Sequence, residues 1–397
     1  MAALGCAACG GAAHKAANSH VLRVPGSYAT IQAAVDAAHS GDLVLIAPGV
    51  YHESVMVGEG HADVVLRGLD RNRVVLDGQD QRATGISVNA DGVAVENLTV
   101  RHYLVNGIEW SPSGEYGGGA PLDGWRGSYI TAYDNGLYGV YAFVAEHGRF
   151  DHVYASGSPD SGIYIGACSP CHALVRDSVA EHNQVGYEAT NAGGDVSVLD
   201  NLWRNNRVGV EIDSLRKEPS FPQHGSTLMS NRIVDNNDRV APRSTEGGFG
   251  AGVAINGGSG NVVEDNLVVG HSEVGIIVLD SPDSVATNNT VRANRLGSNA
   301  VALALQTANG LSQGNCFEDN RSTGRVESAP AGLQAATGRS CASQVKVSAG
   351  RLRLLSPPPQ VDYRTVPAPP PQPIMPAAAA TAPARPAVGN PERETQG

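Results

Sequence analysis

Two glutamates occupy the same place in two neighbouring copies of one short motif. Glu188 lies in the segment 186–189 (Gly-Tyr-Glu-Ala) and Glu211 lies in the segment 209–212 (Gly-Val-Glu-Ile), so the two are 23 residues apart. If that spacing is one coil of a repeat, adjacent strands place the two carboxylates about 5 Å apart. Both cannot ionise comfortably at that distance, and one pKa should rise. Such a pair suits the general acid and the nucleophile or base of glycosidic bond hydrolysis.

Other polar side chains hold equivalent places in the motif. Because side chains alternate along a strand, the residues two and four places after the motif glycine share an outward face, together with the residue two places before it. The glycines are predicted to share this face and to leave an open floor for a flat ligand. The catalytic candidates are Glu188, Glu211, Asp213 and Arg207, and the substrate-binding candidates are Tyr141, Tyr164, Glu109 and Asp160.

The same carboxylates allow two other interpretations. Oxygen ligands from Glu188, Glu211 and Asp213 could hold Ca²⁺, which is the one cofactor that the sequence suggests. The cation would bridge a uronate carboxylate while Arg207, or Arg216 and Lys217 on the adjoining loop, removes the C5 proton. The patch could instead be a solvated sheet face, since outward Glu and Tyr are ordinary on β-surfaces.

Histidines are weaker candidates for chemistry. His152 follows Asp151 and His182 follows Glu181, so each is predicted to pair with a carboxylate, and His172 lies between them in the sequence. A single His is more often a hydrogen-bonded surface residue than a catalyst. The spacing of these residues matches no zinc or copper motif, and no metal site is predicted from them.

The elements that must position these residues are short strands in a repeat. The motif is Gly, an apolar residue, any residue and an apolar residue, and most copies start 22 to 24 residues apart. Longer steps contain loops at 111–124, 213–225 and 237–250. Apolar positions predict an inward face, and Asn residues at the ends of intervening strands predict an internal ladder. The copies begin at Gly85, Gly107, Gly139, Gly162, Gly186, Gly209, Gly252 and Gly275, with a degenerate copy at Asn299.

The two ends of the chain differ from the repeat. Residues 1–20 are small and polar and are predicted to form a mobile tether. Residues 28–38 carry apolar side chains at helical spacing, which predicts a short helix that caps the first coil. The repeat is expected over 21–345. Residues 356–397 are rich in Pro and Ala and are predicted to be disordered or polyproline-like, extended from the surface.

Six cysteines fall into pairs by their spacing. Cys168 and Cys171 predict a short disulfide loop, and Cys316 and Cys341 predict a staple of the last coil. A zinc site made by two Cys-x-x-Cys pairs is the alternative, but a solenoid keeps the N-terminus far from the middle of the chain. Paired cysteines favour an oxidising compartment. The Leu-Gly-Cys ending at Cys6 resembles a lipoprotein cleavage box, so we expect a secreted or cell-envelope protein, periplasmic or lipid-anchored.

The composition argues against two classes of partner. A net charge of −11 does not suit a nucleic-acid surface, which needs clustered Lys and Arg. The sequence contains no run of about 18 apolar residues, so no membrane-spanning segment is expected.

Residues 21–345 resemble the right-handed parallel β-helix proteins of the pectate-lyase-like superfamily. The resemblance is carried by the repeat and by the openings at 28–35 (Tyr-Ala-Thr-Ile-Gln-Ala-Ala-Val) and 41–51 (Gly-Asp-Leu-Val-Leu-Ile-Ala-Pro-Gly-Val-Tyr). It implies an all-β fold, a right-handed single-stranded parallel β-helix, and a polysaccharide partner. It implies no mechanism, because the catalytic signatures do not carry over: 158–161 reads Ser-Pro-Asp-Ser and 289–291 reads Asn-Thr-Val.

Three functions stay open at this stage. The first is an exported protein that binds or acts on an acidic extracellular polysaccharide, as a lyase, a C5-epimerase or a hydrolase if it is catalytic. The second is a non-catalytic glycan-binding or cell-surface scaffold protein. The third, suggested only by the opening, is a periplasmic accessory protein for metal-site maturation.

Overall fold

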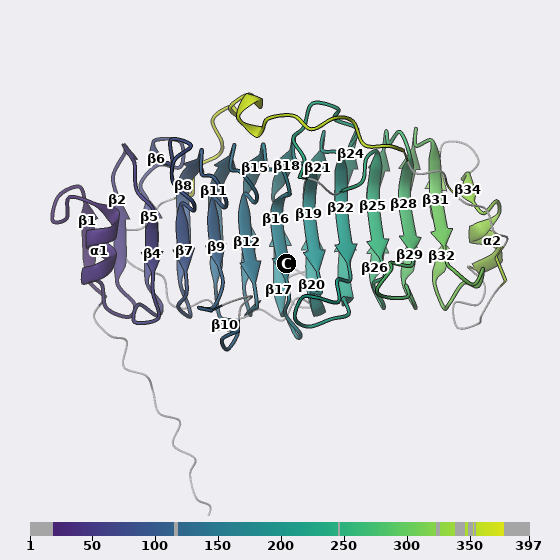
Figure 1. Cartoon of the computed structure of the whole chain (residues 1–397), viewed down its shortest axis with the longest axis horizontal. Helices are drawn as coiled ribbons and strands as arrows, with labels where there is room; N and C mark the ends of the chain where they lie inside the picture. The colour runs from purple at the N-terminus through teal and green to yellow at the C-terminus, as the bar shows by residue number, and fades with distance from the viewer. Residues whose placement is uncertain are drawn as a thin grey trace, which may run out of the picture.

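The computed structural model describes residues 19–114, 118–244, 247–322, 326–337, 346–347, 352 and 355–376. Over these residues the chain forms one parallel solenoid of about 12 turns, in which short strands of successive coils stack side by side (Figure 1). The predicted right-handed β-helix is thereby confirmed.

One face of the solenoid is an 11-stranded parallel sheet that runs the length of the molecule. It contains one strand from each coil, so neighbouring members come from consecutive copies of the motif. Its strands are β4 (Val55–Val57), β7 (Ile86–Val88), β9 (Ile108–Trp110), β12 (Val140–Phe143), β16 (Ser161–Gly166), β19 (Val185–Thr190), β22 (Val208–Asp213), β25 (Ala251–Asn256), β28 (Val274–Leu279), β31 (Val301–Gln306) and β34 (Ser328–Ala329).

The remaining sides of each coil belong to a 21-stranded sheet. Most coils give it two strands, and the long strands β8 and β11 pair with both strands of a neighbouring coil, which joins the two sides into one sheet. Its strands are β1 (Val21–Val24), β2 (Leu43–Ile46), β3 (Gly49–Tyr51), β5 (Val65–Gly68), β6 (Val74–Asp77), β8 (Ala94–Arg101), β11 (Arg126–Tyr133), β14 (Arg149–Asp151), β15 (Tyr154–Ser156), β17 (Ala173–Arg176), β18 (Val179–Glu181), β20 (Gly193–Leu199), β21 (Leu202–Arg204), β23 (His224–Met229), β24 (Arg232–Val234), β26 (Val262–Glu264), β27 (Leu267–Val269), β29 (Thr290–Arg292), β30 (Arg295–Gly297), β32 (Cys316–Glu318) and β33 (Arg321–Ser322). A separate pair joins β10 (Leu122–Asp123) to β13 (Ala145–Glu146).

The interior is filled by the apolar residues of the motif and by stacked asparagines. Ile163, Val210 and Ile276 are fully buried, as the repeat predicts. Asn183 donates to Asn206, which donates to Asn236, each over 3.0 Å. Because each amide also bonds backbone carbonyls at the turn, the ladder satisfies polar groups that every corner would otherwise leave buried and unpaired.

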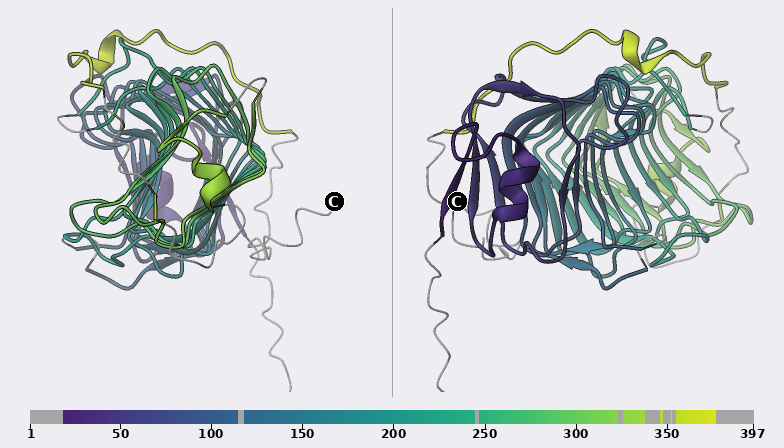
Figure 2. Two further views of the ribbon diagram at one scale, coloured as in Figure 1. Left: turned by 90° about the vertical axis from the view of Figure 1, so that its right-hand side faces the viewer. Right: turned by 60° about the vertical axis from the view of Figure 1, so that its left-hand side comes forward.

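A short helix closes each end of the solenoid (Figure 2). At the N-terminal end α1 (Ile31–Ala37) lies inside the predicted range, and the hydroxyl of Thr30 caps it by accepting from the Ala33 amide. The Glu53 carboxylate accepts from the next two free amides of the helix. At the other end α2 (Leu333–Thr337), which the sequence had not indicated, packs on β31, β32 and β34.

The structure describes part of the Pro/Ala-rich tail. Residues 355–376 are extended, apart from the 3₁₀ turn Tyr363–Thr365, and lie along the upper edge of the solenoid in Figure 1. The tail was predicted to be disordered or polyproline-like and extended from the surface; this part is extended but lies on the solenoid, where it is hydrogen-bonded to residues as far as 300 positions away in the sequence. The tether 1–18 and residues 377–397 lie outside the described residues.

The cysteine prediction is confirmed at one pair. Cys168 and Cys171 form a disulfide within a single turn. Cys316 is also disulfide-bonded, whereas Cys341 and Cys6 lie outside the described residues. Among the helices that the structure describes, none has the length and apolar character needed to cross a membrane.

Candidate functional site

The pairing register places the predicted residues in one column on the 11-stranded sheet. Glu188 on β19 pairs with Glu211 on β22, so the two carboxylates are direct neighbours across the ladder. In the other direction the column continues through Tyr164 on β16, Tyr141 on β12 and Glu109 on β9. The repeat spacing therefore predicted the correct lateral neighbours for this column.

The motif glycines do not form the open floor that was expected. A Cβ atom on Gly186 would lie 2.6 Å from the carbonyl oxygen of Gly209 and 2.9 Å from the amide nitrogen of Asn206. The position therefore contacts the next coil and the internal ladder. Glycine is required there because a side chain would push adjacent coils apart.

The centre of the site is a cluster of four carboxyl groups: Asp160, Glu188, Glu211 and Asp213. Burial raises the pKa of Glu188 well above its usual range, and the charges of its three neighbours add to this effect. Burial and the charges of Asp213 and Asp160 raise the pKa of Glu211 to about 8. Burial raises the pKa of Asp213 to about 7, although a hydrogen bond from Thr190 opposes the rise. The cluster therefore holds protons at neutral pH.

Hydrogen bonds give the four carboxyl groups different roles. The Thr190 hydroxyl lies 2.7 Å from Asp213 Oδ1 and 3.4 Å from Glu188 Oε1, so it stands between the two acids. Asp160 is hydrogen-bonded to Glu188 and to Tyr138, and both bonds favour the protonated form of the partner. The hydrogen bond with Asp160 therefore favours the protonated form of Glu188, whereas the hydrogen bond from Thr190 favours the charged form of Asp213.

A group of tyrosine rings lies directly beside the carboxyl cluster. The rings of Tyr141 and Tyr164 stack with centroids 4.6 Å apart, and Tyr138 lies 4.7 Å from Tyr141. Tyr164 is only 2% exposed, and its hydroxyl donates to Glu218 over 3.4 Å. The structure therefore leaves Tyr138 and Tyr141 as the half-exposed rings that a ligand could contact, while Tyr164 supports them from below.

Two predicted residues take other positions. Glu109 accepts hydrogen bonds from Ser87 over 2.7 Å and from Asn106 over 2.6 Å, which fixes its carboxylate at the far side of the tyrosines. Arg207 is fully buried and donates to the backbone carbonyls of Ala241, Pro358 and Pro359. All of these bonds lead to the insertion loop and the C-terminal segment. Arg207 is therefore assigned a structural role and not a catalytic one.

Two insertion loops border the cluster at opposite ends of its strands. The first follows β22 and carries Lys217 and Glu218. The second, 237–250, reaches the start of β16, where the Ser244 amide donates to the carbonyl of Pro159, next to Asp160.

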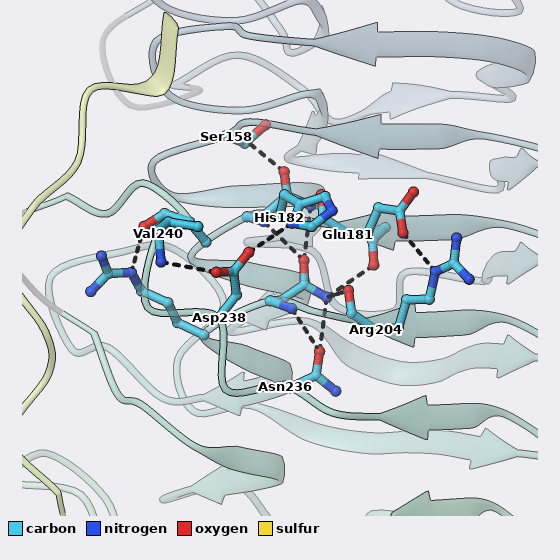
Figure 3. Close-up of polar contacts among 12 residues, drawn as sticks. Ser158, Glu181, His182, Arg204, Asn236, Asp238 and Val240 are labelled. Atoms are coloured by element: carbon cyan, nitrogen blue, oxygen red, sulfur yellow. Dashed lines mark hydrogen bonds and ion pairs between the residues drawn. The ribbon is translucent and has the colours of Figure 1, made fainter. Parts of the chain in front are cut away.

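A histidine fixes the second loop in place. His182 Nδ1 lies 2.7 Å from Asp238 Oδ2, and Asp238 also accepts from the Val240 amide (Figure 3). The hydrogen bond from His182 to Asp238 raises the pKa of His182. His182 was expected to pair with Glu181. Instead it bonds Asp238, and Glu181 accepts from Arg204 over 2.6 Å.

The other two histidines are also paired with aspartates. His152 lies 3.2 Å from Asp151, as its position in the sequence predicted, and His172 lies 2.6 Å from Asp195 of the next coil. These contacts are consistent with a structural role for the histidines.

Several residues of the site were not identified from the sequence. Thr190 stands in the same column as Asp213, so a fuller reading of the repeat could have found it. Tyr138 and Glu218 lie in turns and loops outside the motif, and their approach to the cluster depends on loop conformation. Within the described ranges, no three His, Cys, Asp or Glu side chains are arranged to hold a metal ion. Ca²⁺ stays a prediction.

Comparison with known families agrees with this architecture. Residues 84–291 and 223–348 match the family described as right handed beta helix region. The chain belongs to this family. No curated protein matches the sequence.

Solved structures of the same fold are distant in sequence. The Azotobacter vinelandii mannuronan C-5 epimerase AlgE4 A-module is 16% identical, with a TM-score of 0.47, and the match covers 75% of this chain and 94% of that one. XylC in complex with xylose is 10% identical, with a TM-score of 0.50, covering 77% and 85%. An alginate lyase from Paenibacillus sp. str. FPU-7 is 13% identical, with a TM-score of 0.45, covering 73% and 98%. At these identities the likeness establishes the fold alone.

Proposed function

We propose that this β-helix protein binds a polysaccharide along the outward face of its 11-stranded sheet and hydrolyses it at the carboxyl cluster. The observation that carries the proposal is the set of half-buried, mutually interacting carboxyl groups beside half-exposed tyrosine rings. Aromatic rings contact the apolar faces of sugars, and paired carboxyl groups are the usual catalysts of glycosidic bond cleavage. The complex of XylC with xylose supports a sugar as the ligand class.

Glu188 and Asp213 carry the two roles of the reaction. Glu188, whose pKa is raised furthest, gives its proton to the glycosidic oxygen as the bond to the anomeric carbon breaks. Asp213, whose charged form accepts from Thr190, attacks that carbon or activates the water that does. Glu211 pairs with Glu188 across the ladder, and its charge contributes to the raised pKa of Glu188.

Hydrolysis is favoured over the lyase and epimerase alternatives. Both of those reactions need a base that removes the C5 proton, and Arg207 is buried against backbone carbonyls. Arg216 donates to the carbonyl of Asp283, and Lys217 acts as a positive charge that lowers the pKa of Glu218. A cluster that holds protons at neutral pH supplies an acid instead.

The substrate that fits best is neutral rather than acidic. Five carboxyl groups, the four of the cluster and that of Glu218, lie at the proposed ligand position. The positive charge of Lys217 lowers the pKa of Glu218. A uronate polymer would bring further negative charge to this surface. The sequence favoured an acidic polysaccharide, but we propose a neutral, hydroxyl-rich one as the substrate.

The experiment that tests the function is a panel of neutral and acidic polysaccharides assayed for new reducing ends. Hydrolysis predicts product from a neutral polymer, at least about a hundredfold less product with Glu188→Gln, and wild-type activity with Glu59→Gln in an exposed turn. Turnover that survives Glu188→Gln would overturn the assignment. Binding without turnover, lost in Tyr141→Ala, would favour the glycan-binding alternative.

The proposed place of action is outside the cytoplasm. The Cys168–Cys171 disulfide supports this, because such bonds persist in oxidising compartments. Lipid anchoring at Cys6 remains a prediction that mass spectrometry of the membrane fraction would test.

A further inference from the structure

An extended segment lies along the edge of the solenoid that is at the top in Figure 1. Residues 355–376 run back from the coil that carries Glu273 to the coil that carries Asn97. A solenoid is otherwise built from contacts between adjacent coils. This segment therefore bridges coils that have no other direct contact.

The solenoid offers hydrogen-bond donors where the segment has free carbonyls. Arg207 donates to the carbonyls of Pro358 and Pro359 over 2.9 and 2.8 Å. At the far end, Arg71 donates to the carbonyl of Pro373 over 3.1 Å and Asn72 donates to the carbonyl of Gln372 over 2.9 Å. Proline carries no amide hydrogen, so a proline-rich segment presents unpaired carbonyls that suit such donors.

The same edge offers acceptors where the segment has amide hydrogens. The amide of Gln372 donates to Asn72 Oδ1 over 2.8 Å, and the amide of Met375 donates to Asn97 Oδ1 over 2.9 Å. The amide of Leu355 donates to the Glu273 carboxylate. Donors and acceptors of the solenoid therefore match backbone groups at six residues near the two ends of the segment, as in a binding site.

The two arginines of this edge are buried. Arg71 is 2% exposed and Arg207 is fully buried, and each bonds backbone carbonyls of the solenoid as well as those of the segment. A guanidinium group that is removed from water needs its donors satisfied. The carbonyls of the docked segment accept hydrogen bonds from some of these donors.

We propose that this edge is a docking track for an extended, proline-rich peptide segment, filled in cis by residues 355–376, and that the docked segment holds residues 237–244 of the second insertion loop in place. The link is Arg207, which bonds Ala241 in the loop and Pro358 in the segment. The same loop contacts Pro159, next to the carboxyl cluster. The docking inference stands independently of the reaction at the cluster.

The first test uses hydrogen exchange of the full chain, followed by mass spectrometry. The double variant Pro358→Gly/Pro359→Gly keeps Arg207 and the loop but increases the freedom of the undocked segment. We expect exchange of Ser244 and of the segment to rise about tenfold, because the two changes together give the undocked segment more conformational freedom to lose on docking. Asn72→Ala is the matched variant at the far end, and it should raise exchange at Gln372 and Met375 only.

Two results would overturn the proposal. One is exchange of residues 355–376 in the wild-type chain at the rate of an unstructured peptide. The other is a double variant in which the segment loosens while exchange of Ser244 stays unchanged, because the segment would then not hold the loop.

The second test asks whether the track accepts its segment in trans. A chain ending at residue 354 is titrated with a synthetic peptide of residues 355–376 and with a scrambled peptide of the same composition. Saturable binding of the native peptide alone, with restored protection of residues 237–244, supports the track, and equal binding of both peptides contradicts it. If the shortened chain does not fold, the exchange comparison on the full chain decides.

Discussion

The raised pKa of Glu211 makes a prediction about stability. A carboxyl group whose pKa is higher in the folded than in the unfolded chain binds more protons when folded, so stability falls as pH rises between the two values. For Glu211 that window runs from its ordinary value of 4.5 to about 8. The full interval corresponds to roughly 5 kcal/mol. Because the side chain is partly exposed and shares protons with its neighbours, we expect about 1–3 kcal/mol.

The perturbation is Glu211→Gln, which keeps the shape of the side chain but cannot ionise. The variant should be about 1–3 kcal/mol more stable than the wild type at about pH 9 and little different at about pH 4. Urea denaturation followed by circular dichroism across that range measures the difference, with Glu59→Gln in an exposed turn as the control. If Glu211→Gln and wild type lose stability in parallel as pH rises, the carboxyl group ionises freely and the interpretation of the cluster fails.

Three further substitutions test the packing around the site. Gly186→Ala would place a methyl group 2.6 Å from the carbonyl oxygen of Gly209, so thermal denaturation should show a loss of about 2–4 kcal/mol. Asn206→Ala removes a rung of the internal ladder and should cost about 2–4 kcal/mol in urea denaturation, whereas loss of under about 0.5 kcal/mol would mean that water replaces the rung. Asp238→Asn should lower the pKa of His182 toward 6.5, and an unchanged NMR titration would rule out this pairing.

The sequence determined the fold and the central column of the site. Glu188, Glu211, Tyr141 and Tyr164 hold the same motif position, and in a solenoid the residue at that position lies beside the matching residue of the next coil. One repeat spacing therefore fixes both the neighbour and the face of each side chain. Thr190 was within reach of the same reasoning because it shares a column with Asp213.

The roles of Arg207, the glycines and the C-terminal segment were decided only by the tertiary structure. Arg207 bonds Pro358, 151 residues away, and nothing in the repeat indicates a partner at that separation. A Cβ atom on Gly186 would meet the next coil and the internal ladder, so strict alternation assigned this residue to the wrong face. Periodicity describes contacts between adjacent coils, whereas loops and the returning segment obey no period, so only the folded chain places them.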